Sequence, residues 1–189
     1  MIEKKQSYRV RGKSKKIIMI KKINGFEPQI GEGTFVAETA AVVGDVIIGE
    51  NCSVWYSAVL RGDVNKIRVG NRVSIQDGCC LHCSDGTAFV EIGNNVTIGH
   101  NATIHGCKID DNCLIGMGST ILDNAHIGKG SIVAAGALVL SRTQIGEMEL
   151  WGGVPAKFIK KISQEAIDRL ITPGLNHYDY WTKVYLEEE

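Results

Sequence analysis

The chain has 189 residues, enough for one domain with a substantial core and short appendages. Its formal net charge is zero, but nine Lys or Arg residues occur up to Lys22 against Glu3 alone, so the rest of the chain is acidic. A neutral chain with an acidic body argues against a nucleic-acid groove. The apolar run Ile17–Ile20 is too short for a membrane span or a secretory core, so we expect no membrane partner.

Residues 1–29 are predicted to be a basic N-terminal tail and a first strand around Ile17–Ile23, closed by Gly25 and Pro28. The basic tail is typical of a solvated segment, with a targeting role as the alternative. Six cysteines without a secretory signal favour reduced thiols and a cytoplasmic location.

Residues 30–153 are predicted to form one repeat, because an aliphatic residue returns about every six positions. This period fits neither a helical face nor one continuous strand, but it is typical of short strands joined by tight turns in a hexapeptide β-helix. Three strands then make one coil, and equivalent strands stack about 4.8 Å apart. The inward aliphatic positions are Ile30, Val36, Val42, Ile48, Val54, Leu60, Val69, Ile75, Leu81, Ile92, Ile98, Ile104, Ile109, Ile115, Ile121, Ile127, Val133, Val139 and Ile145.

Small residues four positions later are predicted to point inward as well, which lets the corners close. Cys52, Cys79 and Cys113 occupy such inward positions, and we interpret them as small buried hydrophobic residues. Cys80 and Cys83 have the C-x-x-C spacing of a redox pair or half a zinc site. No second pair and no adjoining βαβ pattern accompanies them, so the sequence favours neither role.

Two insertions interrupt the repeat, one over residues 62–66 and one over residues 84–88. They leave the prism at neighbouring levels, and loops on a rigid scaffold often carry function.

Residues 154–189 are predicted to be a C-terminal helical segment. Ser163 is a plausible N-cap with Glu165 in the first turn, and residues 172–174, Thr-Pro-Gly, are expected to end this helix. A second helix is predicted over about Leu175–Glu187. Its apolar stripe of Tyr178, Trp181, Val184 and Tyr185 is expected to pack against the prism or a neighbouring subunit.

Counting repeats predicts which side chains stack. Leu60, Leu81 and Ile104 are each three strands apart and should therefore share one wall. The residues that directly follow them should form one outward column: Arg61, His82 and His105. Two imidazoles one coil apart lie at chelating distance.

His100 follows Ile98 by two positions and therefore belongs to a different wall, with Asp77 one coil below it. It should not reach the other two histidines within one subunit. In a threefold assembly, however, a metal could be shared by His82 and His105 of one chain and His100 of the partner subunit. Three imidazoles with an open fourth position are typical of a catalytic zinc centre.

The neighbouring polar residues have ordinary alternatives. Arg61, Asp63 and Asp77 could be exposed charges, but their levels favour interface ion pairs that hold the ligand walls together. Gln76 could be solvated or could hydrogen-bond a metal-bound water. His126 and His177 are interpreted as surface residues.

The segments LRGDVNKIRVG, SIQDGCCLH, VTIGHNATIHGC, IGMGS and GGVPAK together resemble the gamma-class carbonic anhydrases, in particular short bacterial relatives classed as transferase hexapeptide proteins. The likeness covers about residues 30–157. It implies a left-handed all-β prism, a homotrimer, and a C-terminal helix beside the prism. It also implies a Zn²⁺ site, with Fe²⁺ or Co²⁺ as alternatives, held by His82, His100 and His105. Further implied roles are trimer contacts for Arg61, Asp63 and Asp77, and a place near the metal-bound water for Gln76.

The sequence departs from that family in three places. Val64 replaces a glutamate, Ser74 stands where asparagine is common, and the acidic loop that carries the proton shuttle is reduced to residues 84–88 with Asp85 its only acid. The implied reaction is reversible hydration of CO2 to bicarbonate by zinc-activated water. Without a clear proton relay, we expect slow, buffer-dependent or absent turnover.

Two other functions remain open. Many hexapeptide prisms transfer acyl groups from coenzyme A or hydrolyse thioesters, with one histidine base and no metal. A non-catalytic trimeric scaffold that keeps the metal for assembly is the third hypothesis.

Overall fold

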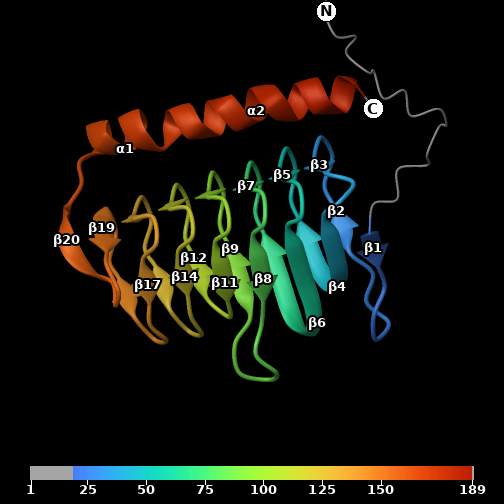
Figure 1. Ribbon diagram of the computed structural model, residues 1–189, viewed down its shortest axis with the longest axis horizontal. Helices are drawn as coiled ribbons and strands as arrows, with labels where there is room; N and C mark the ends of the chain where they lie inside the picture. The colour runs from blue at the N-terminus through green and yellow to red at the C-terminus, as the bar shows by residue number, and fades with distance from the viewer. Residues whose placement is uncertain (1–18, 189) are drawn as a thin grey trace, which may run out of the picture.

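The computed structural model describes residues 19–188, which form a prism of stacked parallel coils with helices along one side (Figure 1). This confirms the predicted parallel β-helix. Residues 1–18 of the predicted N-terminal segment lie outside the described residues. Its first strand is β1 (Met19–Lys21), which pairs with the start of β4. Among the described residues, no helix has the length and apolar character needed to cross a membrane.

Three walls build the prism. The first wall contains β8 (Cys80–His82), β11 (Thr103–His105), β14 (Thr120–Ile121) and β17 (Leu138–Val139). The second wall contains β2 (Gln29–Ile30), β9 (Val90–Ile92), β12 (Lys108–Ile109), β15 (His126–Ile127) and β18 (Gln144–Ile145). Two long strands, β4 (Ala41–Ile48) and β6 (Val59–Val69), run through both of these walls and join them into one sheet.

The third wall is a separate sheet. It contains β3 (Phe35–Val36), β5 (Ser53–Val54), β7 (Ser74–Ile75), β10 (Thr97–Ile98), β13 (Leu114–Ile115), β16 (Ile132–Val133) and β19 (Glu149–Gly152). An antiparallel strand, β20 (Lys157–Lys161), pairs with β19 at its end. The sequence does not predict β20, because its residues, KFIKK, do not alternate between apolar and polar. All five are exposed in the structure.

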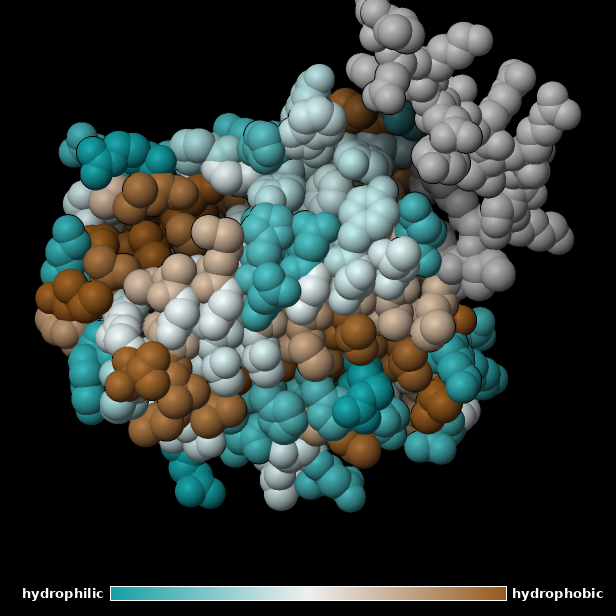
Figure 2. Space-filling model, viewed as in Figure 1, coloured by the Kyte–Doolittle hydropathy of each residue, from teal (hydrophilic) through white to brown (hydrophobic). Residues whose placement is uncertain are grey.

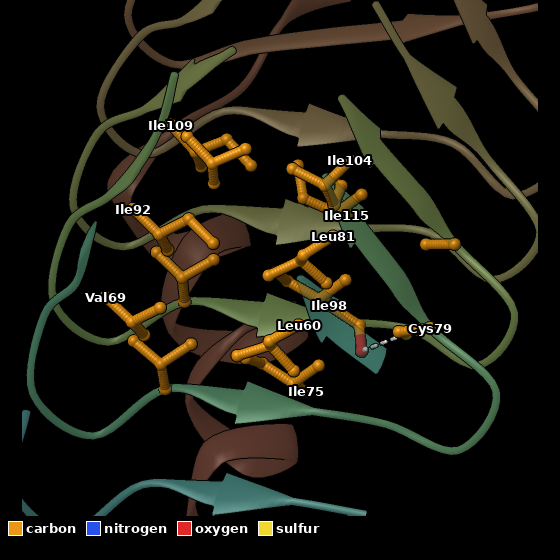
Figure 3. Packing of buried hydrophobic residues seen from close by; sticks show 14 of the residues in the cluster. Leu60, Val69, Ile75, Cys79, Leu81, Ile92, Ile98, Ile104, Ile109 and Ile115 are labelled. Carbon is orange, nitrogen blue, oxygen red and sulfur yellow. Dashed lines mark hydrogen bonds between the residues drawn. The ribbon is translucent and has the colours of Figure 1, made fainter. Parts of the chain in front are cut away.

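The stacking register agrees with the repeat count. Leu60 pairs with Leu81, and Leu81 pairs with Ile104. Figure 3 shows these residues beside two further columns, one through Ile75 and Ile98 and the other through Val69, Ile92 and Ile109. The aliphatic columns meet inside the prism, where most of their side chains are fully buried.

The inward cysteines are buried as predicted. Cys52, Cys79 and Cys113 are at most 1% exposed, and burial raises the pKa of each thiol, to about 11 for Cys79 and about 12 for Cys113. Cys80 is exposed, whereas Cys83 is buried with its thiol donating to the Lys66 carbonyl. The two C-x-x-C thiols therefore lie in different environments.

The two C-terminal helices are present, but the second begins earlier than predicted. Helix α1 (Gln164–Leu170) begins as predicted, with the Ser163 hydroxyl accepting from the Ala166 amide. Helix α2 spans Thr172–Glu187, so the Thr-Pro-Gly segment lies in its first turn instead of ending α1. Proline is favourable there, because the first-turn amides have no partner within the helix and the fixed φ suits helical geometry.

Helix α2 packs on the N-terminal part of the third wall. Tyr185 contacts Phe35 and Trp55 with ring centroids 5.2 and 5.3 Å apart, and the Trp55 indole contacts Tyr178 at 5.5 Å. Arg72 also pairs with Asp179 at 2.6 Å. Hydrophobic side chains remain exposed at the other end of the prism, over β20 and α1, and include Phe158, Ile159 and Leu170 (Figure 2).

Replacing Leu81 by alanine tests the core beneath the first wall. Leu81 is completely buried, so Leu81→Ala should lower the free energy of unfolding by about 2–5 kcal/mol through lost burial and the cavity left behind. Urea denaturation at fixed protein concentration measures this loss. Leu186→Ala, at a position 36% exposed on α2, is the control and should change stability by about 0.5 kcal/mol or less. Equal effects of the two changes would contradict the assigned core.

Glu149 gives the last coil a pH-dependent contact. Its carboxylate accepts from Trp151 Nε1 at 2.8 Å and the Gly146 amide at 2.9 Å, and it pairs with Lys161 at 3.0 Å. Burial raises the pKa of Glu149, but these donors outweigh it and hold the pKa below the ordinary 4.5. A lowered folded-state pKa means that the stabilisation is present above pH 4.5 and is lost as the pH falls through the folded-state value.

Glu149→Gln should therefore destabilise the protein near neutral pH. Its difference in stability from the wild type should shrink as the pH falls below 4.5, the ordinary pKa of glutamate. Thermal unfolding across a pH series measures this difference. Glu187→Gln, at an exposed position near the end of α2, is the control. A difference that persists unchanged into acid would contradict the assigned contact.

Candidate metal centre

His82 and His105 lie side by side on the outer face of the first wall. They pair directly in the register of β8 and β11, which confirms the predicted stacking of these two histidines. His82 Nδ1 lies 3.3 Å from His105 Nε2, and the ring centroids are 5.3 Å apart. Both rings are partly exposed, with 18% of the His82 side chain and 31% of the His105 side chain accessible.

Each of these rings has a carboxylate at its other nitrogen. His82 Nε2 lies 3.1 Å from Asp63 Oδ1, and His105 Nδ1 lies 2.6 Å from Asp123 Oδ1. The second oxygen of Asp63 accepts from Arg61 Nη1 at 2.6 Å, and that of Asp123 accepts from the Ser84 hydroxyl at 2.6 Å. A continuous polar chain thus crosses the face of the wall from Arg61 to Ser84.

The two carboxylates are ionised. Burial raises the pKa of each, but hydrogen bonds from Arg61 and His82 hold the pKa of Asp63 below its usual value, and those from Ser84 and His105 do the same for Asp123. An ionised carboxylate only accepts hydrogen bonds. An ionised aspartate therefore favours the tautomer in which the ring N–H of His82 or His105 points toward it.

In that pair of tautomers the facing ring nitrogens, 3.3 Å apart, are both lone-pair acceptors, and a cation between them would offset their mutual repulsion. Two imidazole ligands of a tetrahedral zinc with bonds of about 2.0–2.1 Å are about 3.3–3.4 Å apart. Metal-binding histidines typically donate their other ring N–H to a carboxylate. The donor set and its spacing therefore fit a divalent metal such as Zn²⁺.

His100 lies away from this pair, as the repeat count predicts. It occupies the turn after β10 on the third wall, and its Nδ1 pairs with Asp77 Oδ2 at 2.9 Å. Its Nε2 faces the Tyr178 hydroxyl at 3.5 Å, and 38% of its side chain is exposed. Within residues 19–188, no three His, Cys, Asp or Glu side chains gather in a metal-binding cluster.

The other predicted site residues divide between these two places. Arg61 and Asp63 belong to the His82 side, where they pair with each other. Gln76 is 6% exposed on the His100 side, and its Oε1 accepts from the His100 backbone amide at 3.1 Å. Asp77 pairs with His100. The predicted trimer contacts and the predicted contact of Gln76 with a metal-bound water stay predictions.

The sequence analysis missed Asp123, Ser84 and Tyr178 as neighbours of the histidines. Asp123 could have been found by the same count, because Ile104 pairs with Ile121 and Asp123 follows two positions later. Ser84 lies in an insertion, where counting six-residue repeats does not tell which residues stack on each other. Tyr178 was assigned to the packing stripe of a helix, and only the docking of α2 brings its hydroxyl to His100.

Comparison with known proteins identifies the repeat and its relatives. Residues 27–62 and 106–141 match the family described as bacterial transferase hexapeptide (six repeats). A carbonic anhydrase of Geobacillus kaustophilus is 42% identical over 149 residues, which cover 79% of this chain and 81% of that protein. The mitochondrial gamma carbonic anhydrase 2 of Arabidopsis thaliana is 46% identical over 145 residues, which cover 74% of this chain and 52% of the plant protein.

The chain thus spans about half the length of the plant relative. Among solved structures, a hexapeptide transferase family protein from Anaplasma phagocytophilum superposes with a TM-score of 0.82 at 36% identity. That match covers 89% of this chain and 98% of the other.

Proposed function

Because the chain belongs to the gamma carbonic anhydrase family of hexapeptide-repeat proteins, we propose that it hydrates CO2 reversibly to bicarbonate at a Zn²⁺ site shared between the subunits of a homotrimer. The observation that carries the proposal is the pair of facing ring nitrogens, His82 Nδ1 and His105 Nε2, with a carboxylate at each opposite nitrogen. Fe²⁺ and Co²⁺ are alternative metals, since imidazole also binds them.

The third ligand is proposed to be the partner subunit's His100. A side chain that is 38% exposed and held by Asp77 at Nδ1 leaves Nε2 as the nitrogen available to a metal. Tyr178 would release that nitrogen on assembly. Exposed apolar residues on both walls support two facing surfaces. Met117 is 57% exposed one coil above His100, and Leu140 is 46% exposed two coils above His105.

When bound, Zn²⁺ with an open fourth position would supply Lewis acidity and a water-derived nucleophile near neutral pH. The protein's own part is to hold the ligands. Asp63, Asp123 and Asp77 contact the rings of His82, His105 and His100, respectively, and Gln76 accepts from the His100 backbone amide. Because Val64 replaces the family glutamate and Asp85 is the only acid of the short loop, proton export is proposed to be slow and dependent on buffer.

Removing one of the paired histidines should remove the metal. His105→Ala leaves His82 without a chelating partner, so bound zinc should fall from about one per subunit to nearly none. Elemental analysis after zinc loading measures metal, and stopped-flow CO2 hydration at several buffer concentrations measures activity. His126→Ala, which removes a histidine paired with Asp110 on the second wall, is the matched control and should leave both unchanged. Full metal content in His105→Ala would refute the site.

Mixing two inactive variants tests whether the site is shared. In His100→Ala trimers and in His105→Ala trimers every site lacks one ligand. In trimers mixed randomly from equal amounts, a site is complete only where a His100→Ala subunit supplies His82 and His105 and a neighbouring His105→Ala subunit supplies His100. Each condition holds for half of the subunits, so about a quarter of the wild-type metal should return. A site contained in one subunit would give no recovery on mixing.

Acyl transfer is the second candidate, favoured by the likeness to the Anaplasma phagocytophilum hexapeptide transferase family protein. A transferase that works through a histidine base needs no metal. Acyl transfer from a coenzyme A thioester that survives chelation would support this candidate over CO2 hydration. If chelation instead dissociates the trimer and no reaction is measured, the scaffold hypothesis gains support.

A further inference from the structure

The insertion at residues 84–88 is anchored firmly although it is short. Ser84 and Ala88 close it through backbone hydrogen bonds of 3.1 Å and 3.4 Å. The side chain of Asn65, in the other insertion, donates to both the Ser84 and the Ala88 carbonyl oxygens, at 3.3 and 3.2 Å. The two insertions therefore lie together, and the base of the second one is held in place beside the histidine pair.

The anchored loop reaches His105 through a single carboxylate. The Ser84 hydroxyl donates to Asp123 Oδ2 at 2.6 Å, and Asp123 Oδ1 lies 2.6 Å from His105 Nδ1. Both carboxylate oxygens are thus engaged, one by the loop and one by the imidazole. Rotation of the Asp123 side chain would break both contacts at once.

Gly106, directly after His105, leaves the space in which Asp123 and the loop pack. Gly106 has a φ of +55°, and a Cβ at that position would meet the Asp123 carboxylate and lie 2.6 Å from the Ala88 methyl group. The Asn124 amide donates to the Gly106 carbonyl at 2.7 Å, which fixes the turn that carries Asp123. The loop, Asp123 and the residue next to His105 therefore pack as one body.

We propose that Ser84 and Asp123 form a positioning unit that keeps the His105 proton on Nδ1 and leaves Nε2 as the free acceptor facing His82. As a metal-site role, this rests on the proposed function, but the tautomer itself is a property of the metal-free chain. If the proton moved to Nε2, that nitrogen would donate to His82 Nδ1 across the 3.3 Å gap. The pair would then be hydrogen-bonded and closed to a metal.

Asp123→Asn tests the unit directly, because an amide of the same size can present its NH2 group to Nδ1. In the full-length metal-free protein, ¹⁵N NMR of labelled histidine rings should show the His105 proton shifted from Nδ1 to Nε2. Zinc affinity, measured by competition with a chelating dye, should fall about 10–100-fold. Ser84→Ala should weaken zinc binding less, since the carboxylate remains.

Asp110→Asn is the matched control. Asp110 Oδ2 lies 2.8 Å from His126 Nε2 on the second wall, so the same chemistry is changed away from the site. It should leave the His105 tautomer and zinc affinity as in the wild type. Asp123→Glu should restore part of the zinc affinity if a carboxylate is what matters, and it serves as the test if the asparagine variant does not fold.

An unchanged His105 tautomer in Asp123→Asn, or undiminished zinc affinity, would overturn the positioning role. Failure of the proposed function looks different. Wild-type protein would then bind no zinc, while the tautomer change between wild type and Asp123→Asn would still decide whether Ser84 and Asp123 position His105.

Discussion

In-register stacking of parallel strands is the constraint on which the rest of this structure depends. Each residue of a coil lies over its counterpart in the next coil, about 4.8 Å away, because the backbone hydrogen bonds of parallel strands fix that spacing. An aliphatic residue at one inward position therefore requires a similar residue above it, as in Leu60, Leu81 and Ile104. The same rule aligns whatever follows on the outside. His82 and His105 meet because the buried residues before them are stacked.

This constraint explains what could be predicted from the sequence. A six-residue period is visible without a structure, and it fixes both the wall and the level of each side chain. The stacking of His82 on His105, the separation of His100, and the burial of Cys52 and Cys113 all follow from that count. Asp123 was within reach of the same argument, since its strand continues the first wall without an insertion.

The parts that could not be predicted lie outside the repeat. Ser84 belongs to an insertion, where no register relates one residue to the next coil, and its contact with Asp123 depends on how the loop folds back on Asn65. Helix α2 was placed too late because Pro173 is favourable both after a helix and in the first turn of one. Strand β20 lacks any hydrophobic alternation, so only its pairing with β19 reveals it.

Division of the ligands between walls would link metal binding to assembly. His82 and His105 are rigidly stacked within one subunit, but His100 belongs to another wall and cannot move to them without breaking the pairing of β10 with β7 and β13. If the metal binds only the assembled form, it stabilises that form by mass action, and low subunit concentration weakens metal binding in turn. The short loop contacts Asp123 through Ser84, and Asp123 in turn contacts His105, so the proposed positioning of His105 would not depend on the loop's single acid. On the proposed function, metal binding and proton export would then depend on different residues, so this sequence could keep the first while weakening the second.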